Sequence, residues 1–103
     1  MVKYRRLPRF DADYQRLSEA ERQKFKKALA VFIAACREYE AQPERYVWPA
    51  SLRIEKLGGT PVMAMTWSFS GPDGRATFQF DTIDGEMGVV WRRVGRHRIY
   101  LEP

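Results

Sequence analysis

The fold is decided by residues 70–82, SGPDGRATFQFDT, in which a turn leads into a regular alternation of apolar and polar side chains. The Gly-Pro-Asp-Gly segment has the residue types of a tight turn. The alternation that starts at Arg75 has a period of two, which predicts a strand with one buried face. The predicted inward residues are Ala76, Phe78 and Phe80, and the predicted outward residues are Arg75, Thr77, Gln79 and Asp81.

Similar segments on both sides of this strand predict a small sheet. Strands are expected at 51–57, 62–69 and 87–94, with a short last strand at 99–101. The turns at Gly58-Gly59 and Asp84-Gly85 are short, so neighbouring strands are expected to be antiparallel. Residues 62–69 are expected to bury their heavier side chains, which are Met63, Met65, Trp67 and Phe69. Residues 87–94 contain two competing apolar sets, and their inward face stays unassigned.

Two helices are predicted before the sheet. The spacing of Phe10, Tyr14 and Leu17 gives one apolar helical face, directly after a short strand at 3–7. Ser18 and Glu21 have the spacing of a capping box, which predicts a second helix over about 19–41. The order β-α-α-β-β-β(β) indicates an α+β fold, with two N-terminal helices on one face of a small antiparallel sheet and the other face open to solvent.

Composition narrows the class of protein. The chain of 103 residues is expected to form a single domain, 1–103, and its 45% hydrophobic residues exclude a disordered chain. One cysteine excludes an internal disulfide framework and a cysteine-built zinc site, and no metal or cofactor is expected. The longest apolar run has nine residues, which is too short for a membrane span, and the N-terminus lacks the apolar core of a signal peptide. We therefore expect a cytoplasmic protein.

The net charge of +5 is concentrated at the two ends of the chain. Residues 1–17 and residues 91–103 each carry a net charge of +3, whereas residues 18–90 carry −1. If the two ends meet in space, they form a positive patch that favours a polyanion or an acidic protein partner. A solvated surface that only aids solubility explains the charge equally well.

Four short motifs, in this order and spacing, resemble the RelE/ParE superfamily of toxins from type II toxin–antitoxin systems. They are Phe10-x-x-x-Tyr14-x-x-Leu17, then Glu55 to Gly59 (EKLGG), then Asp73 to Phe78 (DGRATF), then Val94 to Tyr100 (VGRHRIY). The resemblance covers nearly the whole chain and implies two helices packed on a small antiparallel sheet. It also implies an antitoxin that covers the toxin. RelE-like members of the superfamily cleave mRNA on the ribosome, and ParE-like members poison DNA gyrase.

The resemblance implies two catalytic roles on the predicted strands. Arg75 matches the strand arginine that binds the scissile phosphate, and a planar guanidinium is suited to that task. Glu55 matches a catalytic glutamate that serves as general base in some members. Other members use lysines on the following strand, and residues 62–67 contain none here. The ordinary alternatives are an exposed strand-end arginine and a solvated strand glutamate.

Two further candidates lie near the C-terminus. His97 is the only histidine and matches the position of a general acid in several members. The reference pKa of histidine, near neutrality, suits proton transfer. Tyr100 matches a tyrosine that stacks on a base or positions the nucleophile. A surface histidine within a basic run and a core tyrosine with its hydroxyl at the rim are the plain alternatives. The candidates for RNA or phosphate binding are Arg53, Arg92, Arg96 and Arg98, with Arg96 the best match to a second phosphate clamp.

Together these features predict the toxin of a type II toxin–antitoxin system, a metal-independent endoribonuclease that cleaves mRNA on the ribosome through attack by the ribose 2′-OH. Its expected partners are mRNA on the ribosome and an antitoxin with an acidic or amphipathic segment, without a membrane or a small-molecule cofactor. A ParE-like gyrase inhibitor and an inactive toxin-like binding module remain as alternatives.

Overall fold

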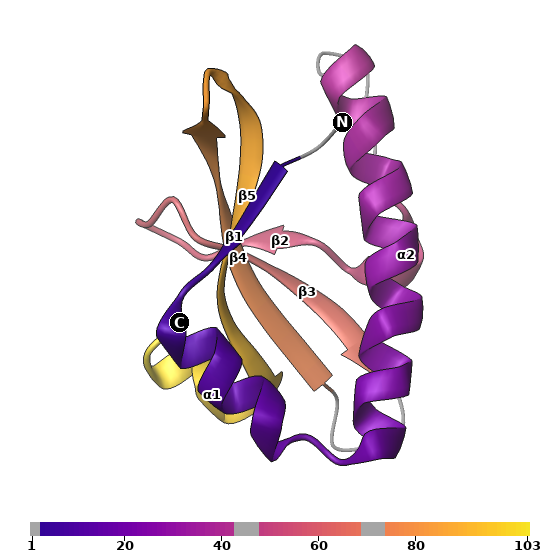
Figure 1. Ribbon diagram of the computed structural model, residues 1–103, viewed down its shortest axis with the longest axis vertical. Helices are drawn as coiled ribbons and strands as arrows, with labels where there is room; N and C mark the ends of the chain where they lie inside the picture. The colour runs from indigo at the N-terminus through magenta and orange to yellow at the C-terminus, as the bar shows by residue number, and fades with distance from the viewer. Residues whose placement is uncertain (1–2, 43–47, 69–73) are drawn as a thin grey trace.

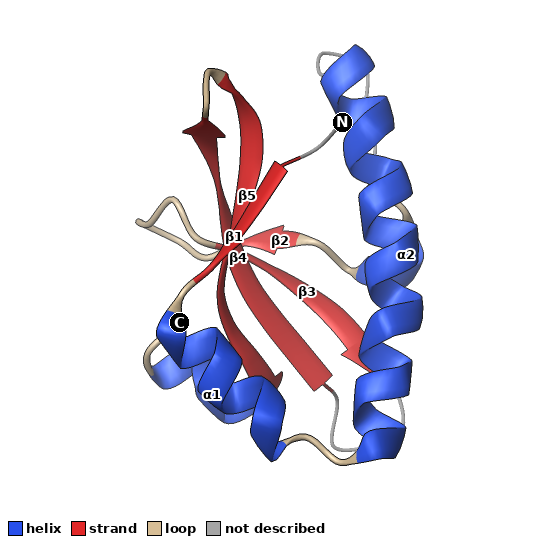
Figure 2. Ribbon diagram, viewed as in Figure 1, coloured by secondary structure: helices blue, strands red, loops and turns tan. Residues whose placement is uncertain are grey.

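The computed structural model describes residues 3–42, 48–68 and 74–103 (Figure 1). Its elements, in chain order, are β1 (Lys3–Arg6), α1 (Pro8–Arg16), α2 (Glu19–Ala41), the 3-10 helix η1 (Ala50–Leu52), β2 (Glu55–Lys56), β3 (Met63–Ser68), β4 (Gly74–Ile83), β5 (Glu86–Arg96) and the 3-10 helix η2 (His97–Leu101). The strands form one sheet in the order β1-β5-β4-β3-β2. Figure 2 shows the two helices packed on this sheet, with α1 against β5 and the longer α2 against β3.

The α+β architecture with two helices on the sheet is confirmed, and the sheet is mixed. β5, β4, β3 and β2 are antiparallel neighbours, as their short connections predict. β1 instead runs parallel to β5, with Lys3 opposite Gly88 and Arg6 opposite Trp91. The two helices separate β1 from the other strands along the chain, so no hairpin forces an antiparallel pairing there.

Local sequence signals place both helices. Pro8 stands at the start of α1, where its missing N–H costs no hydrogen bond. The capping box of α2 forms as predicted, because the N–H of Glu21 donates to Ser18 Oγ (3.1 Å) and the N–H of Ser18 donates to Glu21 Oε1 (2.8 Å). α2 then spans Glu19–Ala41, the predicted range.

The core between the helices and the sheet is largely aromatic. The ring of Phe32 on α2 lies 4.8 Å from that of Phe78 on β4 and 5.3 Å from that of Trp91 on β5. Phe25, about two turns earlier on α2, packs edge-on against Trp67. The predicted inward side chains of β3 and β4 are all in or against this core: Met63, Met65, Trp67, Ala76, Phe78 and Phe80. Phe69 and the predicted turn at 70–73 lie outside the described residues.

A β-bulge resolves the ambiguity of residues 87–94. Thr77 on β4 lies opposite Arg93, but the next residue, Phe78, lies opposite Trp91, so that Arg92 is the extra residue on β5. The bulge reverses the alternation of inward and outward side chains at that point. Val89, Trp91 and Val94 therefore all reach the core, which a strict period of two does not allow.

Two predicted strands are wrong. Residues 51–57 were expected to be continuous, but η1 occupies the first part and only the two residues of β2 pair with β3. Arg53 between them has a φ of 45°, a left-handed conformation that interrupts a strand. Residues 99–101 belong to η2 and form no strand.

The face opposite the helices is less open than predicted. Ala64, Thr66 and Thr77 point to it, yet all three are buried. η2 packs over β4 and β5 at this place. A Cβ atom on Gly95 would lie only 3.0 Å from Ile99 Cγ2, so the glycine allows the close approach of η2 to the sheet. The C-terminal segment thus forms a partial third layer.

Candidate functional site

Three of the predicted catalytic residues meet on the face opposite the helices. Arg75 pairs with Thr66 on β3, and Glu55 pairs with Ala64 two residues earlier on that strand, so both side chains project to the same face. The Tyr100 hydroxyl donates to Glu55 Oε1 at 3.3 Å, across 45 positions of the chain. η2 therefore delivers the tyrosine to the two strand residues, and we call Glu55, Arg75 and Tyr100 the triad.

The electrostatics of the triad keep the tyrosine protonated. Burial raises the pKa of Tyr100 above its ordinary value of 10, and the Glu55 carboxylate raises this pKa further. The Arg75 guanidinium acts in the opposite direction, through its charge and a hydrogen bond. Tyr100 is therefore a neutral hydrogen-bond donor at pH 7, in contact with a carboxylate and a guanidinium. Glu55 is exposed and accessible to a ligand from solvent, whereas Arg75 is partly buried.

The packing on the other side of the sheet fixes Arg75. The indole N–H of Trp67 donates to the Arg75 carbonyl oxygen at 2.8 Å. Gly74, one residue earlier, lies so close to the Trp67 ring that a Cβ atom there would overlap it. The glycine and the tryptophan thus set the start of β4, and with it the direction in which the arginine leaves the sheet.

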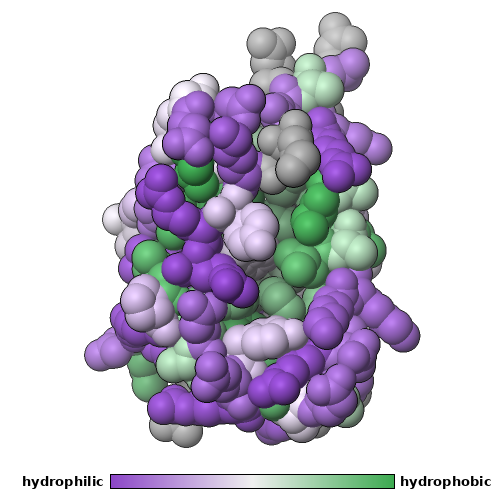
Figure 3. All heavy atoms as spheres, in the orientation of Figure 1, coloured by the Kyte–Doolittle hydropathy of each residue, from purple (hydrophilic) through white to green (hydrophobic). Residues whose placement is uncertain are grey.

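A groove of about 480 Å³ opens on the helix face, between α1 and α2. Its floor is apolar and includes Phe10, Phe25, Leu29, Val89 and Trp91. Figure 3 shows this hollow as a green region surrounded by a purple, hydrophilic rim. The basic rim residues are Arg6, Lys26 and Arg37. Two of the exposed large apolar side chains, Tyr4 and Ile33, also line this groove.

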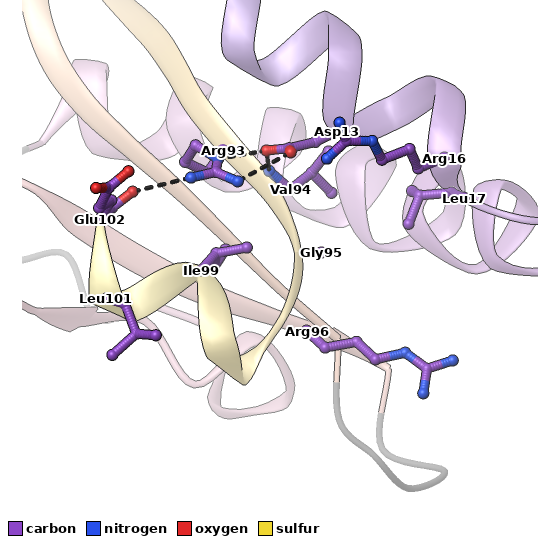
Figure 4. Close-up of a pocket in the computed structure, with 10 residues that line it drawn as sticks. All are labelled: Asp13, Arg16, Leu17, Arg93, Val94, Gly95, Arg96, Ile99, Leu101 and Glu102. Carbon is purple, nitrogen blue, oxygen red and sulfur yellow. Dashed lines mark hydrogen bonds and ion pairs between the residues drawn. The ribbon is translucent and has the colours of Figure 1, made fainter.

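A second groove, of about 580 Å³, lies along the end of β5 between α1 and η2 (Figure 4). Arg93 stands in it between Asp13 on α1 and Glu102, and donates hydrogen bonds to both. Arg96 extends away from these residues in the same view. This groove belongs to the edge of the sheet, and the triad lies outside its lining.

The architecture is similar to solved structures of an E. coli toxin. A chain of the intact RelBE toxin–antitoxin complex matches with a TM-score of 0.55 and 21% identity, over 93% of this chain and 96% of that chain. A RelE mutant in the free state matches with a TM-score of 0.56 and 21% identity, over 98% and 92% of the two chains. The same mutant toxin bound to a RelB peptide gives a TM-score of 0.54 at the same identity and coverage.

This protein has a RelE-like fold. No protein-family model matches the sequence, and no curated protein matches it either. At 21% identity the likeness extends to the fold, and the residues of the site must be judged by their own geometry.

Two of the predicted phosphate-binding arginines, Arg92 and Arg96, are engaged away from the triad. Arg92 lies on its face of the sheet but donates to Gln79 Oε1 and to the Pro103 carbonyl oxygen, each at 3.1 Å. Arg96 lies opposite Gly74 and forms an ion pair with Glu21 of α2, at 3.3 Å, on the helix side. Arg53 is exposed after η1. Phosphate binding by Arg92 or Arg96 would require these contacts to open.

Two predicted residues lie beside the triad in the chain but outside the described side chains. His97 and Arg98 begin η2, and their backbone is described, whereas their side chains are not. Among the described residues, no group of three histidine, cysteine or carboxylate side chains could hold a metal ion. The helices of the described part of the chain are also too short or too polar to cross a membrane.

Sequence reasoning missed Asp13 and Arg93. Both are charged side chains in segments read for their apolar pattern, and 80 residues separate them. Asp13 follows the buried Phe10 by three positions, so a helical face that buries one also brings the other toward the sheet. That spacing was the one available signal, and it does not identify the partner.

Proposed function

We propose that this protein is the toxin of a type II toxin–antitoxin system and cleaves mRNA on the ribosome. The observation that carries the proposal is the triad, in which Glu55, Arg75 and Tyr100 meet on one face from three distant parts of the chain. The RelE-like fold supports the same reading, since the similar structures are those of a toxin and a toxin–antitoxin complex.

The chemistry of the triad suits strand scission without a resident metal. Glu55 takes the proton of a ribose 2′-OH, and the alkoxide attacks the adjacent phosphorus. Arg75 donates to the non-bridging phosphate oxygens and stabilises their growing charge. The neutral Tyr100 hydroxyl orients Glu55 and the nucleophile. His97 returns a proton to the leaving 5′ oxygen, so the products are a 2′,3′-cyclic phosphate and a 5′-OH end.

We further propose that an antitoxin occupies the groove between α1 and α2. The groove has an apolar floor of aromatic and aliphatic side chains and a rim with Lys26 and Arg37. Arg6 on the same rim is already paired with Asp11 at 3.3 Å. An amphipathic helix with acidic flanking residues matches this pattern, because its apolar stripe covers the floor and its carboxylates meet the basic rim.

The function is tested with purified protein and ribosomes programmed with a defined mRNA. The expected result is cleavage in the ribosomal A site, with fragments that carry 2′,3′-cyclic phosphate ends. Intact mRNA, or fragments that end in a free 3′-OH, would contradict the mechanism. If the mRNA stays intact, a DNA supercoiling assay tests the ParE-like alternative, which predicts inhibition of gyrase.

A further inference from the structure

The C-terminal segment is anchored on both sides of Tyr100. Before the tyrosine, Ile99 is buried against Gly95 of β5. After it, the Glu102 carbonyl oxygen accepts hydrogen bonds from Arg9 Nη2 and from Arg93 Nη1, both at 3.2 Å. The position of the Tyr100 hydroxyl over the sheet therefore depends on these anchors as well as on its own contact with Glu55.

Arg93 is the more deeply placed of the two anchoring arginines. Its Nη2 donates to Asp13 Oδ1 at 3.0 Å and its Nε donates to Asp13 Oδ2. With Nη1 bound to the Glu102 carbonyl oxygen, all three nitrogens of the guanidinium are engaged. Only 18% of the Arg93 side chain and 8% of the Asp13 side chain are exposed, whereas Arg9 is about half-exposed. Arg93 thus serves as a clamp within the protein, and binding a phosphate would cost it these contacts.

Asp13 in turn is fixed to the edge of the sheet. Its Oδ2 also accepts from the backbone N–H of Val94, at 3.3 Å. Within the described part of the chain, β1 covers β5 only as far as Trp91, so the Asp13 carboxylate takes the place of a strand partner for the N–H of Val94. One carboxylate therefore joins α1, the uncovered edge of β5 and, through Arg93, the C-terminal segment (Figure 4).

A buried ion pair stabilises a fold little more than apolar side chains of the same size would, so its directional hydrogen bonds are the property that distinguishes it. Here those bonds end on the segment that carries Tyr100. We propose that Asp13 and Arg93 are positioning residues that hold residues 97–103 across the sheet and thereby set the Tyr100 hydroxyl against Glu55 and Arg75. The consequence for cleavage rests on the proposed function, whereas the consequence for Tyr100 itself does not.

The test uses the double variant Asp13→Asn/Arg93→Gln. The first substitution keeps an amide oxygen for the Val94 N–H, and the two new amides can pair without a buried charge. The side chain introduced by the second is too short to reach the Glu102 carbonyl oxygen as well. The readout is the pKa of Tyr100, followed by tyrosinate absorbance and assigned by the difference from the matching Tyr100→Phe proteins. Far-UV circular dichroism across the titration identifies the pH range in which each protein is folded.

The expected result is that Tyr100 in the double variant titrates nearer to 10, its ordinary value, than in the wild type. The matched control is Asp11→Asn, which lies on α1 like Asp13 and removes the ion pair of Asp11 with Arg6. This variant should leave the titration of Tyr100 unchanged. A folded double variant in which Tyr100 titrates as in the wild type would overturn the proposal. If the double variant does not fold, Arg93→Lys replaces it, because one ammonium group cannot serve Asp13 and Glu102 together.

Cleavage supplies a second readout that separates positioning from general stability. We expect the double variant to cleave mRNA about tenfold more slowly than the wild type. In a Tyr100→Ala background the same two substitutions should have no further effect, since they act through the tyrosine. An equal additional loss in that background would overturn the positioning role. If the wild type shows no cleavage, the proposed function fails, and the titration of Tyr100 still decides the role of Asp13 and Arg93.

Discussion

The two faces of the sheet are built by different forces. The helix face is closed by aromatic rings, with Phe32 in contact with Phe78 and Trp91. The opposite face is closed by directional contacts, in which arginines bind the carbonyl oxygens of the C-terminal segment. Apolar packing is strong and non-directional, while charged hydrogen bonds contribute less energy and fix geometry. The apolar packing that stabilises the fold therefore lies on one face of the sheet, and the candidate catalytic residues lie on the other.

The largest effect should come from a cavity on the helix face. Phe32→Ala removes a ring that is 1% exposed, and we expect the free energy of unfolding to fall by about 3–5 kcal/mol. Val31→Ala, at an exposed neighbouring position, should change it by less than about 0.5 kcal/mol. Denaturant unfolding measures both variants. Equal values for the two would contradict the claim that the aromatic core of the helix face stabilises the fold.

A smaller effect is expected where the two faces meet at Gly74. Gly74→Ala would bring a Cβ atom into the Trp67 ring, and such overpacking destabilises a fold by about 1–3 kcal/mol. Because Arg75 follows directly, we expect a larger relative decrease in the rate of mRNA cleavage than in the free energy of unfolding. The matched control is Gly58→Ala, where no atom lies within 4 Å of the added carbon. Wild-type stability and cleavage in Gly74→Ala would contradict this account of the start of β4.

A still smaller loss of stability is expected from changes at the start of α2. Ser18→Ala removes one half of the capping box and should reduce the free energy of unfolding by about 1 kcal/mol. The backbone N–H of Ser18 also lowers the pKa of Glu21 below its usual 4.5. The ionised Glu21 side chain therefore stabilises the fold above pH 4.5, and this stabilisation is lost as the pH falls through the lower pKa of the folded state. The free energies of unfolding of the wild type and Glu21→Gln should therefore converge as the pH falls from about 7 to about 3.

The smallest effect concerns reactivity alone. Burial raises the pKa of the Cys36 thiol to about 12, so almost no thiolate is present near neutral pH. Alkylation by iodoacetamide should be slow in the folded protein and fast in denaturant, as followed by mass spectrometry. Rapid alkylation of the folded chain would show that the core beneath the groove opens readily.

The sequence predicted the helix face far better than the opposite face. Amphipathic spacing and the Ser18 capping box located α2, and strict alternation located the inward side of β4. The bulge at Arg92 and the left-handed Arg53 were not predictable, because each depends on pairing with a distant strand. The contact of Tyr100 with Glu55 was not visible either, since residues 99–101 read equally well as a strand.

The candidate site follows the same division. The resemblance to RelE-like toxins singled out Glu55, Arg75 and Tyr100, and their meeting on one face supports their proposed roles. The ion pair of Asp13 with Arg93 escaped prediction, because charge patterning along a chain does not reveal a partner 80 residues away. The roles of all these residues in RNA binding and cleavage stay predictions, as do those of His97, Arg53, Arg92, Arg96 and Arg98.

The catalytic role of this face is tested most directly by the rate of mRNA cleavage by Arg75→Ala on programmed ribosomes, compared with the wild type and with Arg16→Ala. Arg16 is an exposed arginine in the last turn of α1, away from the triad, and its loss removes the same charge. We expect Arg75→Ala to cleave mRNA at least about a hundredfold more slowly than the wild type, and Arg16→Ala to cleave it at the wild-type rate. Equal cleavage by Arg75→Ala, in a protein with unchanged stability, would contradict the claim that this face of the sheet carries the chemistry.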